Sequence, residues 1–472
     1  AMSTASGAPI QQWACAGTGN QTFAIAANAP PPAGGSGGSG SGGAPGTGGS
    51  AGGTGGAGGT GGAGGTGGAG GAPVPGAGHV SIAHTGDTFT LLRDGQPYPI
   101  KGIDGGFRLD LARSSGANSM RTYDSGGALQ TLNNLQSRGM TLLLGISMTQ
   151  NNTLYSDDTW KNGKRAEVSS LLGQVKDHPA LLMWALGNEI NLGADTQIAW
   201  QFVGELTRMI HAQDPNHPVM TVIAGDNATA MSHVAQWAPE IDVMGVNAYK
   251  RSPNVDAAVK SSQFRGPYVV TEFGPTGQWE TTNTSWGSPL EQTSADKATS
   301  YLQRYQAIAS HPDRAFGSYV FLWGQKQEVT PTWYGMFLET QAALGIAAET
   351  LPTVDSMAAA WGGTAPQNRA PAVTALTLAG KTADASVTLA AGQAAPAAVT
   401  ASDPDGDALS FSWEILPDNN ATTRPARVGA PVLGTSPTLT ITTPAAGNYR
   451  LHVYVLDGKG HAGTANIPFR VM

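Results

Sequence analysis

The sequence of 472 residues contains a single cysteine, Cys15, which excludes an internal disulfide framework and any cysteine-based metal site. Charged residues make up only 12% of the chain, and Lys and Arg form no cluster that would favour binding to nucleic acid. No run of about 18 apolar residues is present, so we expect no membrane span. The sequence also lacks a P-loop, a Gly-x-Ser-x-Gly elbow and metal-like spacing of its nine histidines, so we expect no cofactor for catalysis.

Glycine, in contrast, is abundant at 65 residues, and much of it lies between residues 30 and 78. This segment is Pro-rich at its start and then repeats Gly-Gly with Ala, Thr or Ser. It has no side chain larger than Val, so it cannot offset the entropy cost of becoming ordered. We therefore predict a Gly/Pro-rich disordered linker over residues 30–78.

A short segment, residues 1–29, precedes this linker. Its Gln12-Trp13 and Asn20-Gln21-Thr22-Phe23 stretches resemble the last strand of a ricin-type β-trefoil lectin repeat. The match is far shorter than a trefoil, so it implies a lectin remnant or a tail rather than a complete sugar-binding domain.

Residues 79–365 alternate short apolar runs with helical stretches, which is typical of β/α units. Most of the runs are continuous Val, Ile, Leu and Met, as expected for strands covered on both faces. An open doubly wound sheet would need a Gly-rich phosphate turn after its first strand, and none is present. The pattern therefore predicts an α/β fold, a (β/α)8 TIM barrel. The eight predicted strands are residues 98–104, 119–123, 141–147, 181–186, 218–224, 241–247, 268–271 and 317–322.

Residues 366–472 contain seven short strand-like pieces separated by turn signals, which predicts an all-β sandwich. Residues 401–413 and 447–457 resemble the Ig-like modules of the polycystic-kidney-disease type that are appended to secreted enzymes. That resemblance implies an extracellular, bacterial-type modular enzyme. Asp403, Asp405 and Asp407 stand at alternating positions and offer hard oxygen donors, so they are candidate ligands of a structural Ca²⁺; a plain Asp/Gly turn is the alternative.

Two of the predicted barrel strands end in a glutamate. Asn188-Glu189 follows the fourth strand, and Glu272 follows the seventh. TIM-barrel enzymes place their active sites at this carboxyl end of the strands. Retaining glycoside hydrolysis needs such a pair, with one carboxylic acid to protonate the leaving oxygen and one carboxylate to attack the anomeric carbon. The sequence therefore predicts Glu189 as acid/base and Glu272 as nucleophile.

These positions resemble the clan A glycoside hydrolases, which carry two glutamates on strands four and seven. The resemblance implies that Arg121 lies beside the nucleophile and favours its ionised form. It also implies that Tyr249 donates a hydrogen bond to Glu272, and that Trp323 forms the floor of the sugar subsite. Asn188 and Asn247 complete the set of substrate-binding candidates on strand ends.

Two parts of the barrel resemble different families within the clan. Residues 118–145 are similar to the second and third strands of β-1,3-glucanases and glucanosyltransferases. Residues 245–249 instead resemble the barrel of the β-galactosidase/β-glucuronidase family, and residues 274–280 depart from the plant-type glucanase pattern. Trp279 and Trp333 lie in predicted loops near the site, where rings stack on the apolar faces of sugars. A polysaccharide is therefore the expected substrate, with β-1,3-glucan favoured.

We thus expect a secreted, monomeric, retaining β-glycoside hydrolase that acts on a polysaccharide. A transglycosylase with the same two glutamates remains open, as does a non-catalytic carbohydrate-binding protein. Every catalytic candidate lies in the barrel, so we further expect the linker and the sandwich to be dispensable for the chemistry.

Overall fold

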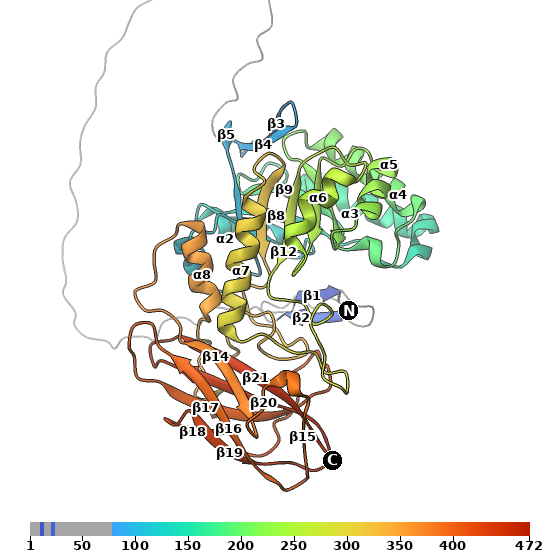
Figure 1. Ribbon diagram of the computed structural model, residues 1–472. Helices are drawn as coiled ribbons and strands as arrows, with labels where there is room; N and C mark the ends of the chain where they lie inside the picture. The colour runs from blue at the N-terminus through green and yellow to red at the C-terminus, as the bar shows by residue number, and fades with distance from the viewer. Residues whose placement is uncertain (1–9, 14–19, 24–77) are drawn as a thin grey trace, which may run out of the picture.

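The computed structural model describes residues 10–13, 20–23 and 78–472. In the first two ranges, β1 (Ile10–Trp13) and β2 (Asn20–Phe23) pair as antiparallel strands. The remainder of the predicted lectin-like segment, and the predicted linker up to residue 77, lie outside the described residues. The continuous part, residues 78–472, forms a closed barrel and additional β-sheets (Figure 1).

The barrel consists of eight strands that are parallel and follow one another in chain order around the ring. This arrangement confirms the predicted TIM barrel. Where the eighth strand meets the first, Gly317 approaches Ile100 so closely that an added Cβ would lie 2.1 Å from the Ile100 carbonyl oxygen. The strands are β6 (Ile100–Asp104), β7 (Ser119–Arg121), β8 (Thr141–Ile146), β9 (Leu181–Leu186), β10 (Val219–Ala224), β11 (Val243–Asn247), β12 (Tyr268–Phe273) and β13 (Ala315–Val320).

A helix follows each barrel strand and covers its outer face, so strands such as β8, β9 and β12 are buried along their whole length. Four of the helices begin at a side chain that accepts hydrogen bonds from the first turn, namely Asp157, Thr196, Asn227 and Thr293. The helices are α1 (Leu109–Ser114), α2 (Ala128–Gln136), α3 (Asp158–Val175), α4 (Gln197–Gln213), α5 (Ala228–Trp237), α6 (Val255–Ser261), α7 (Ser294–Ala309) and α8 (Pro352–Trp361).

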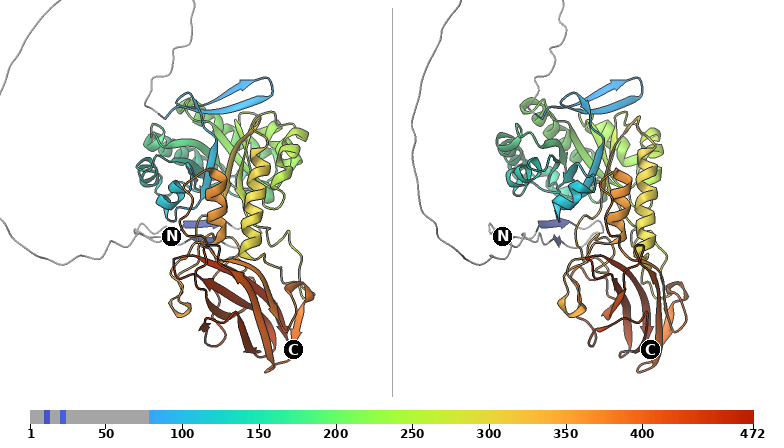
Figure 2. Two further views of the ribbon diagram at one scale, coloured as in Figure 1. Left: turned by 60° about the vertical axis from the view of Figure 1, so that its left-hand side comes forward. Right: turned by 90° about the vertical axis from the view of Figure 1, so that its left-hand side faces the viewer.

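A small antiparallel sheet of β3 (Val80–Thr85), β4 (Thr88–Arg93) and β5 (Gln96–Pro97) precedes the barrel. Val80 and Leu91 of this sheet are buried in one cluster with Leu182 and Met183 of the barrel. The sheet therefore closes the end of the barrel opposite to the carboxyl ends of the strands (Figures 1 and 2). The sequence pattern did not indicate this sheet.

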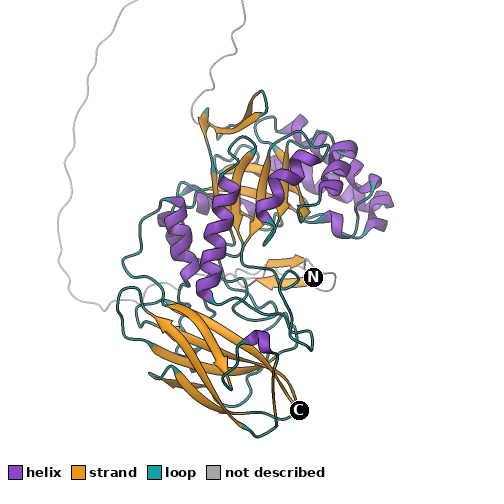
Figure 3. Cartoon of the chain, viewed as in Figure 1, coloured by secondary structure: helices purple, strands orange, loops and turns teal. Residues whose placement is uncertain are grey.

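The C-terminal region contains a three-stranded sheet, β14-β16-β19, and a five-stranded sheet, β15-β21-β20-β17-β18 (Figure 3). Val373 and Ile441 of the first sheet and Trp413, Leu451 and Ile467 of the second belong to one buried core. An Ig-like relationship for this all-β region stays a prediction. The strands are β14 (Ala372–Leu378), β15 (Val387–Leu389), β16 (Ala394–Ser402), β17 (Ser410–Pro417), β18 (Val432–Gly434), β19 (Thr438–Thr442), β20 (Gly447–Leu456) and β21 (Ala462–Val471).

The C-terminal sheets lie beyond α7 and α8, on the side of the barrel away from β3–β5 (Figures 1 and 2). Among the residues that the structure describes, no helix is both long and apolar enough to cross a membrane.

Candidate active site

Asn188 and Glu189 follow β9 directly and lie at the carboxyl end of the barrel. The backbone of Glu189 has φ 54° and ψ 37°, a left-handed conformation that few non-glycine residues adopt. Its N–H donates to the Val222 carbonyl over 2.8 Å, and its carbonyl accepts from Gln150 Nε2 over 3.1 Å. These contacts hold the strained backbone in place, as is common at functional sites.

Glu272 is the second-last residue of β12, and none of its surface is exposed. Tyr249 donates its hydroxyl to Oε2 over 2.7 Å, and Asn247 donates to Oε1 over 2.8 Å. Arg121 Nη1 lies 3.1 Å from the same Oε1. The Glu272 carboxylate thus has three hydrogen-bond donors, and one of them is a guanidinium.

Asn247 connects the two glutamates. Its Nδ2 donates to Glu189 Oε1 over 2.9 Å as well as to Glu272 Oε1 over 2.8 Å. These two oxygens are therefore at most about 5.7 Å apart. The side-chain oxygen of Asn188 accepts from the same Nδ2 and from Arg121 Nη2. The structure thus brings six of the predicted site residues into one hydrogen-bonded group: Arg121, Asn188, Glu189, Asn247, Tyr249 and Glu272.

Arg121 also faces a carboxylate that the sequence analysis did not single out. Asp104, at the end of β6, lies 3.8 Å from Arg121 Nη1 and is fully buried, with no hydrogen bond to either of its oxygens. Burial raises the pKa of Asp104 well above its ordinary value, although Arg121 acts in the opposite direction. The guanidinium of Arg121 also packs 4.2 Å from the Tyr123 ring centroid.

Asp104 and Tyr123 carry signals that the sequence analysis passed over. Asp104 ends the first barrel strand in a carboxylate, as Glu272 ends the seventh, and the same argument would have selected it. Tyr123 stands two residues after Arg121, so the period of a strand places both on one face.

The three predicted tryptophans lie in very different surroundings. Trp279 is 51% exposed, and its ring meets the Tyr249 ring edge-on at 5.2 Å between centroids. Trp323 has no exposed surface and donates its indole N–H to the Phe107 carbonyl. Trp333 is 1% exposed and donates to the Thr276 carbonyl. Of the three, only Trp279 is exposed, and it contacts Tyr249, the donor to Glu272.

The predicted calcium ligands of the C-terminal region do not gather as a set. Oxygen atoms of Asp403 and Asp407 lie within 4.8 Å of each other and of an oxygen of Asp457. Asp405 instead accepts from Arg369 over 2.8 Å. One oxygen of Asp403 is buried without a hydrogen-bond partner. Asp403, Asp407 and Asp457 are therefore the residues whose geometry fits a cation.

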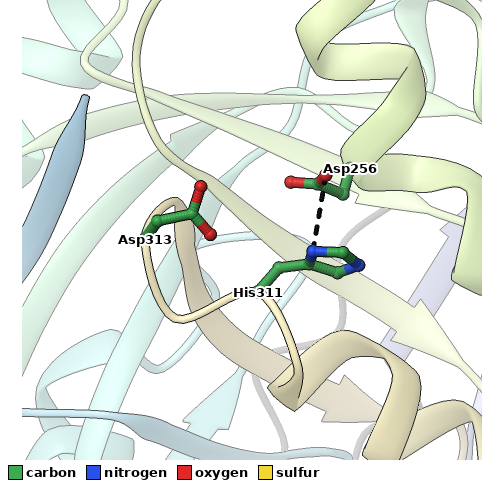
Figure 4. Close-up of side chains that lie close together, drawn as sticks. All are labelled: Asp256, His311 and Asp313. Carbon is green, nitrogen blue, oxygen red and sulfur yellow. Dashed lines mark ion pairs between the residues drawn. The ribbon is translucent and has the colours of Figure 1, made fainter.

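A second group of potential metal ligands lies near the start of β13. His311 Nδ1 is 3.4 Å from Asp256 Oδ2, and Asp313 faces the same space (Figure 4). Lys260 Nζ lies 3.0 Å from Asp256 and 3.4 Å from Asp313. Because this ammonium already balances the carboxylates, we interpret the group as an ion-pair network between α6 and the loop before β13.

One family of known proteins matches part of the barrel. Residues 126–285 match the family described as glycosyl hydrolases family 2, TIM barrel domain. The matched segment contains Glu189, Asn247, Tyr249 and Glu272.

Two curated proteins match shorter segments. A β-galactosidase of Pectobacterium atrosepticum is 29% identical over 91 residues, which are 19% of this chain and 8% of that protein. Mannan endo-1,4-β-mannosidase F of Aspergillus clavatus is 29% identical over 79 residues, 16% of this chain and 18% of that protein. The chain thus spans less than a fifth of the length of either relative.

Two β-glucuronidases are among the solved structures that match this chain. The FMN-binding enzyme of Faecalibacterium prausnitzii L2-6 has a TM-score of 0.47 at 14% identity, over 83% of this chain and 59% of that chain. The Ruminococcus gnavus enzyme in complex with uronic deoxynojirimycin has a TM-score of 0.46 at 15% identity, over 60% and 52%. The family match includes both glutamates and supports a clan A glycoside hydrolase that acts as a β-glycosidase. It does not support a specific β-glucanase type.

Proposed function

We propose that this protein is a retaining β-glycoside hydrolase with Glu272 as nucleophile and Glu189 as acid/base. The observation that carries the proposal is the shared donor between the two carboxylates, Asn247 Nδ2. Retaining enzymes hold their carboxyl groups roughly 5–5.5 Å apart, whereas inverting enzymes need roughly 6.5–9.5 Å to accommodate a water molecule. The bridged pair of oxygens favours the shorter range.

In the first step, ionised Glu272 attacks the anomeric carbon while Glu189 transfers its proton to the departing glycosidic oxygen. The C–O bond to the leaving sugar breaks, and a covalent glycosyl-enzyme forms. In the second step, Glu189 takes a proton from a water molecule that attacks the same carbon. The sugar then leaves with its β-configuration, and Glu272 is released as a carboxylate.

A polysaccharide remains the proposed substrate class, with β-1,3-glucan favoured. The exposed ring of Trp279 beside Tyr249 supports a subsite for a second sugar next to the cleavage point. The curated relatives are named for galactosides and for mannan, so galactan and mannan are the alternatives to glucan. Secretion and a monomeric state belong to the same proposal.

The test is a screen of polymeric β-glucans, mannan and galactan, with sizing of the products and NMR of the first-formed anomer. We expect β-configured products of reduced size from one of these polymers. Products longer than the substrate at high concentration would identify a transglycosylase. An α-configured first product, or no cleavage of any β-linked polymer, would contradict the proposal.

We also propose a structural calcium ion in the C-terminal region, held by Asp403, Asp407 and Asp457. Three carboxylates on one side of a site suit Ca²⁺, which prefers oxygen ligands. Calcium should then raise the midpoint of thermal unfolding relative to an EDTA-treated sample, and Asp403→Asn should remove the difference. Equal midpoints of thermal unfolding with calcium and with EDTA would contradict this assignment.

A further inference from the structure

We propose that the C-terminal β-region positions the substrate-binding loop of the barrel, through Asn466 and Arg450. The loop in question, residues 274–293, connects β12 to α7 and carries Trp279. This inference rests on the proposed function, because it assigns Trp279 to sugar binding.

The first contact is made at Glu291, near the end of this loop. Its side chain is 1% exposed and accepts hydrogen bonds from Lys297 of α7 and from Thr330 and Thr332 of the loop after β13. Asn466 of β21 donates its side-chain N–H to Glu291 Oε2, the oxygen that also accepts from Thr330. Burial alone would raise the pKa of Glu291, but Lys297 and these donors hold it at about 2. The buried Glu291 carboxylate thus connects the β-region to two loops of the barrel, the loop of residues 274–293 and the loop after β13.

The second contact is made by Arg450 of β20, which is 1% exposed. Its Nη2 donates to the Pro289 carbonyl of the loop over 2.6 Å, and its Nη1 donates to Asn466 over 2.8 Å. Asp418 neutralises the guanidinium at 2.9 Å and also accepts from Ser288 of the loop. Because Arg450 and Asp418 form a buried ion pair, the loop backbone meets a fixed partner rather than a mobile surface side chain.

From these contacts a continuous set of neighbours leads to the glutamates. Thr332 is followed by Trp333 and Tyr334, and the Tyr334 hydroxyl donates to Gln278, the residue before Trp279. Tyr249 then packs against both Trp279 and Tyr334, at 5.2 and 5.6 Å between ring centroids. Arg121 and Asn247, in contrast, come from barrel strands and do not depend on the loop. The β-region should therefore govern the position of Trp279 more than the chemistry at Glu272.

The experiment uses the full chain and compares Asn466→Asp and Asn466→Ala with the wild type. The Asp variant keeps the volume of the side chain, removes the N–H donor and places a second carboxylate against Glu291. Hydrogen–deuterium exchange should become about tenfold faster in peptides from residues 274–293, while β8 peptides stay unchanged. With laminarin, a β-1,3-glucan, KM should rise about tenfold and kcat should stay within about twofold, the pattern of lost substrate binding.

Thr443→Val is the matched control, because the Thr443 hydroxyl is buried and bonds only to Ala390 and Gln393 within the β-region. It should destabilise the β-region without changing exchange in the loop or KM. Unchanged exchange in both folded Asn466 variants would overturn the proposal. A fall in kcat at constant KM, or the same changes in Thr443→Val, would overturn it as well. If the wild type does not cleave laminarin, the substrate assignment fails, and loop exchange still decides the positioning role.

Discussion

Asn247 brings two carboxylates together without adding a charge of its own. Its side-chain oxygen accepts from the Thr271 hydroxyl over 2.8 Å, which fixes the amide so that its NH₂ group faces Glu189 and Glu272. A cationic side chain in this place would favour ionisation of both glutamates. A neutral donor does not do so, which suits the proposed role of Glu189 as the acid.

The two glutamates should therefore respond differently to substitution. Glu272→Gln should abolish turnover of every substrate, because an amide cannot form the glycosyl-enzyme. Glu189→Gln should slow cleavage of the polymer by about 10²–10⁴-fold, yet spare the first step with an aryl glycoside whose leaving group needs no proton. Azide should partly restore turnover of the Glu189 variant and give a β-glycosyl azide, which NMR identifies. Equal losses in both variants on both substrates would contradict the roles.

The raised pKa of Asp104 should make the stability of the protein depend on pH. Burial raises its pKa above that of the unfolded chain, so between these two values the folded protein holds a proton that the unfolded chain has lost. Stability contributed by this group is present at low pH and is lost as pH rises through the folded pKa, by up to about 1.4 kcal/mol per pH unit.

Asp104→Asn removes this titration and keeps the shape of the side chain. The wild type should therefore lose stability relative to the variant as pH rises from 4 to 8. Thermal unfolding midpoints of both proteins across this range measure the difference. A difference that does not change with pH would show that Asp104 has an ordinary pKa in the folded protein.

At the scale of elements, the loop after β12 supplies the exposed aromatic surface next to the site. Trp279→Ala should raise KM for the polymer about tenfold, since a stacked ring contributes about 0.5–1.5 kcal/mol beyond its buried area. An aryl glycoside that occupies only the subsite at Glu272 should be affected less. Trp279→Phe keeps a smaller ring, so its KM for the polymer should lie between that of the wild type and that of Trp279→Ala. Steady-state kinetics with both substrates measure the split, and equal losses with both would place Trp279 in the chemistry instead.

The barrel strands could be predicted because their signal is local. Runs such as Leu181–Leu186 and Tyr268–Phe273 are apolar on both faces, and the buried strands of a parallel barrel require this. In strand β4 (Thr88–Arg93), in contrast, only Leu91 is fully buried, and the strand belongs to a small sheet at the barrel end. The cluster that buries Leu91 includes Leu182 and Met183, which lie far along the chain, so the local pattern did not identify the strand.

The rest of the site depends on contacts that no local pattern contains. Trp333 was predicted to bind substrate from its place in a loop, but the guanidinium of Arg450 lies 6.0 Å over its ring and helps to bury it. Asp405 was grouped with Asp403 by spacing, yet Arg369 is its partner. In each case an arginine from a distant segment, Arg450 or Arg369, contacts the side chain that was predicted to bind a ligand.

At the scale of the whole molecule, the barrel and the C-terminal β-region share a polar interface. We expected the β-region to be dispensable for the chemistry, and Glu291 and Arg450 are buried where the two parts meet. Removal of the β-region would leave the Glu291 carboxylate and its donors open to water. That the barrel alone keeps its chemistry stays a prediction.

His452 of β20 lies at the same interface and is fully buried. Burial lowers its pKa to about 4, although Glu414 and Glu291 act in the opposite direction, while Arg450 and Arg424 lower it further. Between pH 6.5 and 4 the unfolded chain thus binds a proton that the folded protein does not bind. Stability should fall as pH decreases through this window, because the unfolded state then holds more protons.

Protonation of His452 in the unfolded chain should lower the free energy of unfolding by about 3 kcal/mol at pH 4, at about 1.36 kcal/mol for each unit of pKa difference. His452→Gln cannot take up this proton, so its thermal midpoint should fall less steeply than that of the wild type between pH 6.5 and 4. Glu291, with a pKa near 2 in the folded protein, also lowers stability as the unfolded chain takes up a proton near pH 4.5, but it does so in both proteins, so the comparison isolates His452. Differential scanning calorimetry of both proteins at several pH values measures the two slopes. Parallel slopes would mean that His452 is protonated in the folded protein, and the interface would then contain a buried imidazolium paired with Glu414 or Glu291.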